Sequence, residues 1–253
     1  YLYDLTTLAP DQMPPGQSLL PGQHAWWISA TALIGVAIVG WLASLFIGRL
    51  QPASPQRPFP RNPAKQTFRD LGALIARRAL LLAALGSVFF WSLGVLGQLN
   101  IDKFARDVPA LVTDQQHVGY LLAILTLGIG IGSVLAGVLS RGKVELGLVP
   151  FGALGMALAA MLLFTVPAGT GSPLSPPYYW ACFWLMTLGV SAGLYDIPLL
   201  AFLQHQSPRE SRGRILAAYN FLSFSGMLLA SGVFGIMAGW LKLSARQIWL
   251  LVG

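Results

Sequence analysis

The chain has 253 residues, of which 10% are charged and 55% are hydrophobic. Soluble domains contain about a quarter charged residues, so this composition excludes an ordinary soluble domain and, with a mean hydropathy of +0.64, predicts a membrane protein. The net charge of +7 does not indicate nucleic-acid binding, because the basic residues lie between apolar segments and do not cluster on one polar face.

Apolar segments follow one another along the chain. Each complete segment reaches the roughly 20 residues that a helix needs to cross about 30 Å of hydrocarbon. We predict complete spans at 25–48, 79–100, 118–140, 146–166 and 178–203, with a sixth at 215–241. A further span opens at Ile248 and is cut off at Gly253, and the chain begins without a methionine, so we expect a fragment of a longer protein.

The basic residues gather in every second connection between these spans. This set consists of Arg49, Arg57, Arg61, Lys65, Arg69, Arg77, Arg78, Arg141, Lys143, Arg209, Arg212 and Arg214. The alternate connections contain Lys103, Arg106, Lys242 and Arg246. Because positively charged connections stay on the cytoplasmic side, the first set predicts cytoplasmic segments. Residues 1–24 contain no lysine or arginine and are predicted to be an external loop, not a signal peptide.

Prolines recur through residues 49–78 and predict an extended linker that divides the chain into two regions. The last part of this linker could form an amphipathic helix on the membrane, with Phe68, Leu71 and Ile75 on one side. Three cations would then reach anionic headgroups: Arg69, Arg77 and Arg78. An ordinary solvated linker is the alternative.

Three spans follow the linker, then three more of which the last is incomplete, as expected of inverted repeats. The middle span of each triplet carries glycines four residues apart. These are Gly128 with Gly132, and Gly235 with Gly239. Such spacing predicts close approach of helix backbones in a packed bundle.

Polar and aromatic residues recur at helical spacing on three spans, as they would along a transport route. The three stripes are Ser87, Trp91, Gly94 and Gln98; Trp184, Thr187, Ser191 and Tyr195; and Asn220, Ser223, Met227 and Ser231. The alternative for any one of these residues is an interhelical hydrogen bond or packing contact worth about 1 kcal/mol or less.

Asp196 is an acid inside an apolar span, where it costs on the order of 2.5–3.5 kcal/mol on insertion scales. Pro198 cannot donate a hydrogen bond to the Leu194 carbonyl, which predicts a kink beside the acid. Gly189 and Gly193 share the face of Asp196, together with Ala192, and this favours close helix contact.

Two roles for Asp196 are open. It could lock two helices by pairing with an arginine of the following loop, or with Asn220. It could instead bind a cation, a proton or a cationic headgroup. Its position near the predicted inner face favours a lock or gate, for which the candidates are Asp196, Pro198, Arg212 and Arg214.

With these features in place, the layout resembles the C-terminal half of a major facilitator superfamily transporter, preceded by the sixth span and the central cytoplasmic loop. The stretch GVLSRGKVELG, residues 137–147, is similar to the loop between the second and third helix of each repeat, with Gly137, Arg141, Lys143 and Glu145 as its motif residues. It lacks the aspartate usually found before the basic residues, so the interdomain latch attributed to that acid is in question here.

Two segments resemble the bacterial lysophospholipid transporter branch, including members fused ahead of an acyltransferase and an acyl-carrier-protein synthetase. They are FFWSLGVLGQLNID at 89–102 and GLYDIPLLAFLQHQSPRESRGRILAAYNFL at 193–222. The resemblance implies inward movement of lysophospholipid, chiefly lysophosphatidylethanolamine, across the bacterial inner membrane by alternating access, supplying an acyltransferase. It also implies that Trp91 and Gln98 face the headgroup and that Tyr195 and Asn220 line the cytoplasmic half of the cavity.

The resemblance gives the expected organisation. The fold would be an all-α transmembrane bundle, with a periplasmic loop at 1–24, the helix ending the N-terminal half at 25–48, a central cytoplasmic linker at 49–78 and the C-terminal bundle at 79–253. Its expected partners are the lipid bilayer, the amphipathic substrate, an opposing N-terminal bundle absent from this chain and an acyltransferase domain or protein. Without that bundle, the chain alone is not expected to transport.

Two other functions compete. A membrane enzyme of the acyltransferase kind needs a histidine with an aspartate five positions later, and His24, His117 and His205 all lack it. No nucleophile elbow, metal-ligand cluster or phosphate loop is recognisable, so no catalytic residue, metal or cofactor is predicted, and a catalytic domain beyond Gly253 is left open. The second competitor keeps the fold but exports drugs or other amphipathic solutes, which aromatic stripes also suit.

Overall fold

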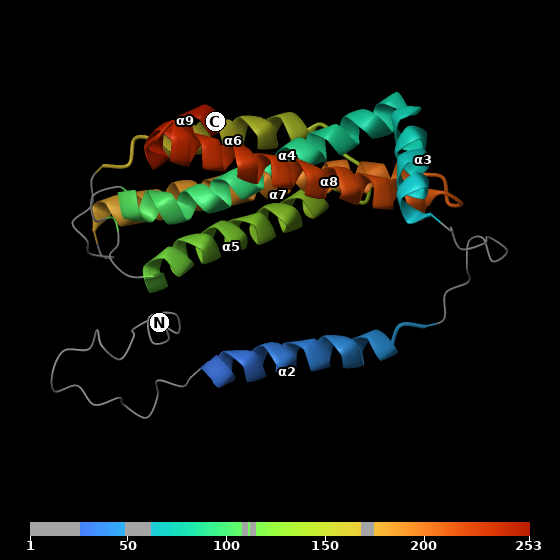
Figure 1. The fold of residues 1–253 in the computed structure, drawn as a ribbon, viewed down its shortest axis with the longest axis horizontal. Helices are drawn as coiled ribbons and strands as arrows, with labels where there is room; N and C mark the ends of the chain where they lie inside the picture. The colour runs from blue at the N-terminus through green and yellow to red at the C-terminus, as the bar shows by residue number, and fades with distance from the viewer. Residues whose placement is uncertain (1–25, 49–61, 108–110, 112–114, 168–174) are drawn as a thin grey trace. The chain divides into compact units, whose positions relative to one another are not determined.

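The computed structural model describes residues 26–48, 62–107, 111, 115–167 and 175–253 (Figure 1). The predicted external loop at 1–24 and most of the proline-rich linker lie outside the described residues. The chain divides into two units, Tyr1–Pro55 and Gln56–Gly253, which are described separately.

The first unit contains helix α2, Trp26–Leu45, within the span predicted at 25–48. The helix has no acidic residue in its first turn and no basic residue in its last turn. Its large apolar side chains are exposed, with Val36 and Trp41 at 71% and 63%. A helix that is apolar all round is suited to hydrocarbon, in which every backbone polar group is satisfied within the helix.

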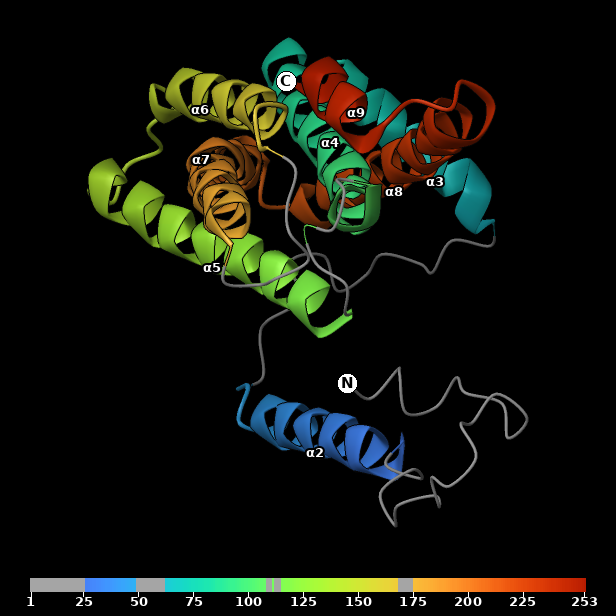
Figure 2. The ribbon, with the colours of Figure 1, turned by 90° about the vertical axis from the view of Figure 1, so that its left-hand side faces the viewer.

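The second unit is a helical bundle whose long members run side by side (Figures 1 and 2). Within the described residues, four helices are long and apolar enough to cross a membrane. These are α4 (Arg78–Asp107), α5 (Gln115–Ser140), α7 (Pro176–Gln206) and α8 (Arg212–Gly235), which continues as the π-helix η2 (Ile236–Trp240).

Helices α6 and α9 are shorter than these four. Helix α6, Leu148–Leu163, has 16 residues where the sequence predicted a span at 146–166, because the chain leaves the helix in turns at Phe164 and Thr165. Helix α9, Ala245–Val252, begins with a capping box formed by Ser244 and Gln247.

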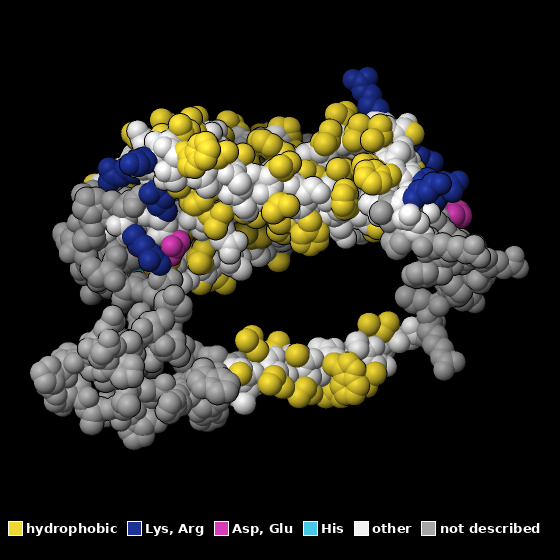
Figure 3. Space-filling view, in the orientation of Figure 1, with side chains coloured by type: hydrophobic (Ala, Val, Ile, Leu, Met, Phe, Trp, Pro, Cys, Tyr) yellow, Lys and Arg dark blue, Asp and Glu magenta, His cyan; other side chains and the backbone are white. Residues whose placement is uncertain are grey.

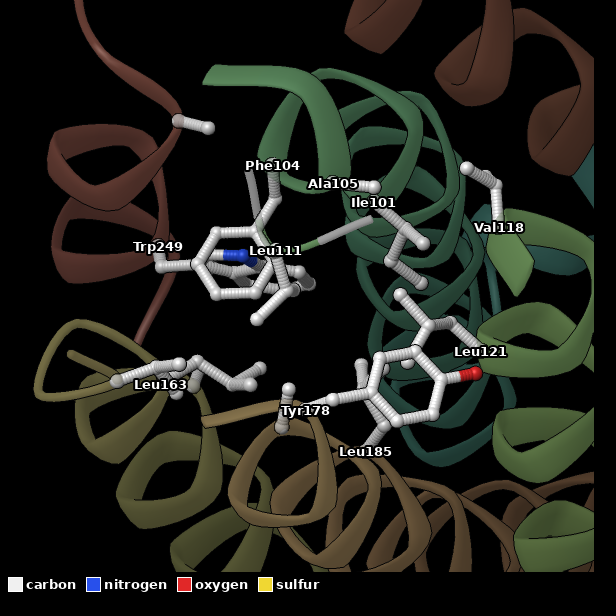
Figure 4. Packing of buried hydrophobic residues seen from close by; sticks show 14 residues of the cluster. Ile101, Phe104, Ala105, Leu111, Val118, Leu121, Leu163, Tyr178, Leu185 and Trp249 are labelled. Carbon is white, nitrogen blue, oxygen red and sulfur yellow. The ribbon is translucent and has the colours of Figure 1, made fainter. Parts of the chain in front are cut away.

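Helix α7 lies between α5 and α6 and also packs on α4 (Figure 2). One buried cluster joins α4, α5, α6, α7 and α9 at the end where α4 finishes. Phe104 and Trp249 meet edge to face in this cluster, with ring centroids 6.4 Å apart (Figure 4). The Asn100 amide nitrogen donates to the Ala245 carbonyl at 2.9 Å, which ties α9 to α4.

Glycines bring α5 and α7 into backbone contact. A Cβ atom built on Gly128 would lie 2.6 Å from the Met186 carbonyl oxygen, and one on Gly132 would strike the Val190 carbonyl. Gly189 and Gly193 meet α5 in the same way from the other side. The close approach predicted for Gly128 and Gly132, and for the small-residue face of Asp196, is therefore confirmed.

The matching prediction for Gly235 and Gly239 is wrong for the described residues. A Cβ atom on either glycine would meet nothing within 4 Å. The helix also changes its winding here, since Gly239 lies in η2 and the Leu241 N–H bonds to the Ile236 carbonyl five residues back at 2.9 Å.

Helix α3, Pro63–Ile75, occupies the last part of the predicted linker and runs across one end of the bundle, at a steep angle to the long helices (Figure 1). We call this end the α3 end. Lysine and arginine side chains gather at the two ends of the second unit, and hydrophobic side chains cover the surface between them (Figure 3). This distribution matches a bundle that crosses a membrane along its long helices.

Candidate transport site

Asp196 lies on α7 and is only 9% exposed. Its Oδ1 accepts a hydrogen bond from the Ser87 hydroxyl of α4 at 3.0 Å, and Ser87 is fully buried. The structure therefore gives Asp196 a different partner from the loop arginine or Asn220 that the sequence suggested. Among the described residues, the carboxyl forms no ion pair.

The neighbouring Tyr195 completes this contact between α4 and α7. Its hydroxyl donates to the Gly86 carbonyl at 3.2 Å, and its ring stacks on Phe90 with centroids 5.7 Å apart and planes inclined by 28°. A Cβ atom on Gly86 would lie 3.2 Å from a methyl group of Leu199. Helix α7 continues through the buried Pro198 to Gln206, so the proline does not end it.

The first polar stripe, on α4, extends from this contact to the surface. Ser87 is buried, whereas Trp91 is 41% exposed and Gln98 is exposed. The third stripe, on α8, has an exposed Asn220 and a buried Ser223 whose hydroxyl finds no hydrogen-bond partner among the described residues. Each of these two helices thus presents polar side chains on the outer surface of the described bundle.

The stripe on α7 behaves differently. Ser191 is buried, and a Cβ atom on Gly155 of α6 would strike its hydroxyl, so this residue is a packing contact between α6 and α7. Thr187 donates to the Phe183 carbonyl of its own helix at 2.9 Å. Trp184 is packed among Trp180 and Phe183, and its indole N–H has no partner in the described part of the chain.

Two hollows lie among the described residues, apart from the three stripes. A hollow of about 610 Å³ lies between the loop 142–147 and the end of α7, where it is lined by Phe202, His205 and Gln206. A second, of about 450 Å³, is formed by one face of α5 from Thr126 to Leu135. Neither hollow is lined by a residue of the three stripes.

The loop motif after α5 forms a tight reversal. Arg141 and Gly142 both have positive φ angles, 47° and 76°, a left-handed conformation that glycine adopts most easily. The Glu145 carboxylate accepts from the Gly147 N–H at 3.2 Å, immediately before α6. Lys143 is exposed, and Gly137 has no close neighbour that a Cβ atom would meet.

Arg214, a candidate for the gate, pairs with Asp70 of α3. Its Nη1 lies 3.4 Å from the Asp70 Oδ1, which also accepts from the Gln66 amide at 2.7 Å. Asp70 is 6% exposed, whereas Arg212, two residues before Arg214, is exposed. Sequence reasoning missed Asp70. It is the single acid within residues 49–78, and its position in a mostly basic segment could have indicated that it pairs with a cation.

We expect Arg214→Gln to loosen α3 from the bundle, because the buried Asp70 carboxylate would keep only its bond from Gln66. Hydrogen exchange of residues 63–75 should be at least several-fold faster than in the wild type. Arg212→Gln is the matched control and should leave the exchange of α3 unchanged. Equal exchange in all three proteins would show that the ion pair does not hold α3.

Comparison with known families gives the identity of the bundle. The sequence model of the Major Facilitator Superfamily matches residues 13–252, and the chain therefore belongs to this superfamily. The predicted all-α transmembrane bundle of this family is thus confirmed, and the chain is a secondary-transporter domain, not an enzyme domain. Neither the curated proteins nor the solved structures gave a match.

Proposed function

We propose that the chain belongs to a transporter that moves lysophospholipid, such as lysophosphatidylethanolamine, across the bacterial inner membrane by alternating access. The observation that supports this most is that the membrane-crossing helices α4 and α8 carry exposed polar and aromatic side chains: Trp91, Gln98 and Asn220. Polar side chains on membrane-crossing helices are costly in lipid and usually face a bundle partner or a water-filled cavity.

The chemistry of these side chains suits an amphipathic lipid with one chain. The Gln98 and Asn220 amides can donate to phosphate and glycerol oxygens, and the Trp91 ring offers an apolar surface to an acyl chain. Asp196, buried without an ion pair among the described residues, offers a negative charge to the ammonium group of an ethanolamine headgroup. The substrate would then meet α4 and α8 on one side and an opposing bundle on the other.

The proposal includes the topology inferred from charge. Residues 49–78, the loop with Arg141 and Lys143, and the loop before α8 would be cytoplasmic, and residues 1–24 would be periplasmic. The transported lipid would then arrive where a cytoplasmic acyltransferase, separate or fused, can restore its second chain. The α3 end would be the cytoplasmic end of the bundle.

Uptake of labelled lysophosphatidylethanolamine tests this function. We expect vesicles that contain the complete protein to accumulate the lipid, and unlabelled lysophospholipids to compete while cationic dyes do not. No accumulation by a folded protein would overturn the lysophospholipid assignment and leave only a transporter of this superfamily.

A second candidate is an exporter of cationic amphipathic drugs. Asp196, which forms no ion pair among the described residues, favours it as well, because a buried carboxylate attracts any amphipathic cation. Competition separates the two functions, since a drug exporter would be inhibited by cationic dyes and not by lysophospholipids.

A further inference from the structure

Helix α3 has a well-defined start and one face bound to the bundle. Asn62 caps it by accepting from the Lys65 N–H at 3.0 Å, and Pro63 stands in the first turn, where no N–H is needed. Leu74 is fully buried and Asp70 is 6% exposed, so the side chains four residues apart on this face pack against the bundle. The helix is therefore a folded element and not part of a solvated linker.

The helix also carries an exposed apolar strip. Phe68 and Ile75 are 68% and 54% exposed, and Gly72 lies between them at helical spacing with no atom within 4 Å of its built Cβ. Further along the chain, Leu82 of α4 is 59% exposed. Phe68 and Ile75 would gain hydrophobic free energy if lipid or another apolar partner buried them.

A second strip is basic. Lys65 and Arg69 lie four residues apart on α3 and are exposed, as is Ala73, four residues after Arg69. Arg77 is exposed too, but it lies in the turn between α3 and α4 and not on the helix. The one acid of the helix, Asp70, is turned to the bundle and paired with Arg214, so it does not cancel this charge. The outer surface of α3 is thus apolar on one side and cationic on the other.

The direction of α3 fits a membrane surface. The helix runs across the α3 end of the bundle, at a steep angle to the long helices (Figure 1), and lysine and arginine side chains gather at this end (Figure 3). If the long helices cross the bilayer, α3 lies along its surface.

We propose that α3 and the turn after it form a binding surface for anionic phospholipid, with Phe68 and Ile75 entering the acyl boundary. Lys65 and Arg69 of the helix and Arg77 of the turn bind headgroup phosphates. Charge complementarity selects this occupant, because the exposed charges of α3, Lys65 and Arg69, are both positive and adjoin an apolar strip. The bound lipid is a resident of the bilayer at the transporter's edge. This inference does not depend on which substrate is transported.

The test places a nitroxide label at Gly72→Cys or at Ala73→Cys, adjacent positions on the apolar and the basic strip. The complete protein, with its other cysteines replaced, is reconstituted into vesicles of phosphatidylethanolamine with or without phosphatidylglycerol. We expect the label at 72 to collide with oxygen and be protected from a water-soluble nickel chelate when phosphatidylglycerol is present. The label at 73 should stay accessible to the chelate. Equal access at both positions in both vesicles would overturn the proposal.

A charge variant tests the headgroup contact separately. Arg69→Gln with Arg77→Gln should weaken the binding of phosphatidylglycerol to the purified protein by roughly fivefold for each cation removed. Lys143→Gln, another exposed basic position outside α3, is the matched control and should bind as the wild type does. If the double variant binds phosphatidylglycerol as the wild type does, whether or not the control loses binding, the anionic lipid binds elsewhere.

Discussion

Replacing Asp196 by asparagine is expected to lower transport by at least tenfold while the protein stays folded. Asparagine has nearly the same volume, and its amide oxygen can still accept the hydrogen bond from Ser87. Asparagine carries no charge into the membrane, so stability should be unchanged or higher. A buried acid that is dispensable for folding and necessary for transport is a functional group. Initial uptake rates of labelled substrate and thermal melting of the same preparations measure the two effects.

Two further variants sharpen this result. Asp102→Asn removes an acid that is 48% exposed and paired with Arg106 on the same helix, so transport should be kept. Ser87→Ala leaves the Asp196 carboxyl without its hydrogen-bond donor and should reduce transport less than Asp196→Asn does. If Asp196→Asn transports at the wild-type rate, Asp196 serves packing between α4 and α7 and not the transport cycle.

Replacing Gly132 by leucine is expected to cause the largest loss of stability among the substitutions considered. The first side-chain carbon would already strike the Val190 carbonyl, and a backbone cannot move aside as a flexible side chain can. Overpacking of this kind costs about 1–3 kcal/mol, and α5 must separate from α7 along its length to relieve it. A clear drop in melting temperature in detergent, together with a lower yield in membranes, would report the effect.

Gly130→Leu is the control for this substitution. It makes the same chemical change on the same helix, two residues away, where a Cβ atom would meet nothing within 4 Å. The control should melt close to the wild type. Similar melting of both variants would mean that the glycine contact between α5 and α7 does not limit stability.

The sequence was sufficient for the membrane helices, because hydrocarbon demands long apolar segments whatever their neighbours are. The helix α5 begins at Gln115 and ends at Ser140, close to the predicted 118–140. The sequence was less reliable for the end of α6. Hydropathy does not distinguish a helix from a turn within the same apolar segment, such as the turn at Phe164 and Thr165. Spacing alone also could not show that Gly128 and Gly132 meet a partner whereas Gly235 and Gly239 do not.

Partners distant in the sequence were the part that could not be predicted. Ser87 and Asp196 are 109 positions apart, and Asp70 and Arg214 are 144 apart. A buried acid signals that it needs a partner, but several hydroxyl, amide and guanidinium groups satisfy that need equally well. The choice depends on how α4 and α8 lie against α7 and α3, and this is decided by packing across the whole bundle. The roles proposed for the polar stripes stay predictions.

The glycine contact between α5 and α7 has a consequence for motion. Where backbones touch directly, no side chains remain that could change rotamer and let one helix slide past the other. The two helices should therefore move as one rigid body during any change of conformation. The contact between α4 and α7 is made instead by Tyr195, Phe90 and Leu199, whose side chains can reorient. Sliding of α4 against the rigid pair of α5 and α7 is thus expected, at the contact that includes Asp196.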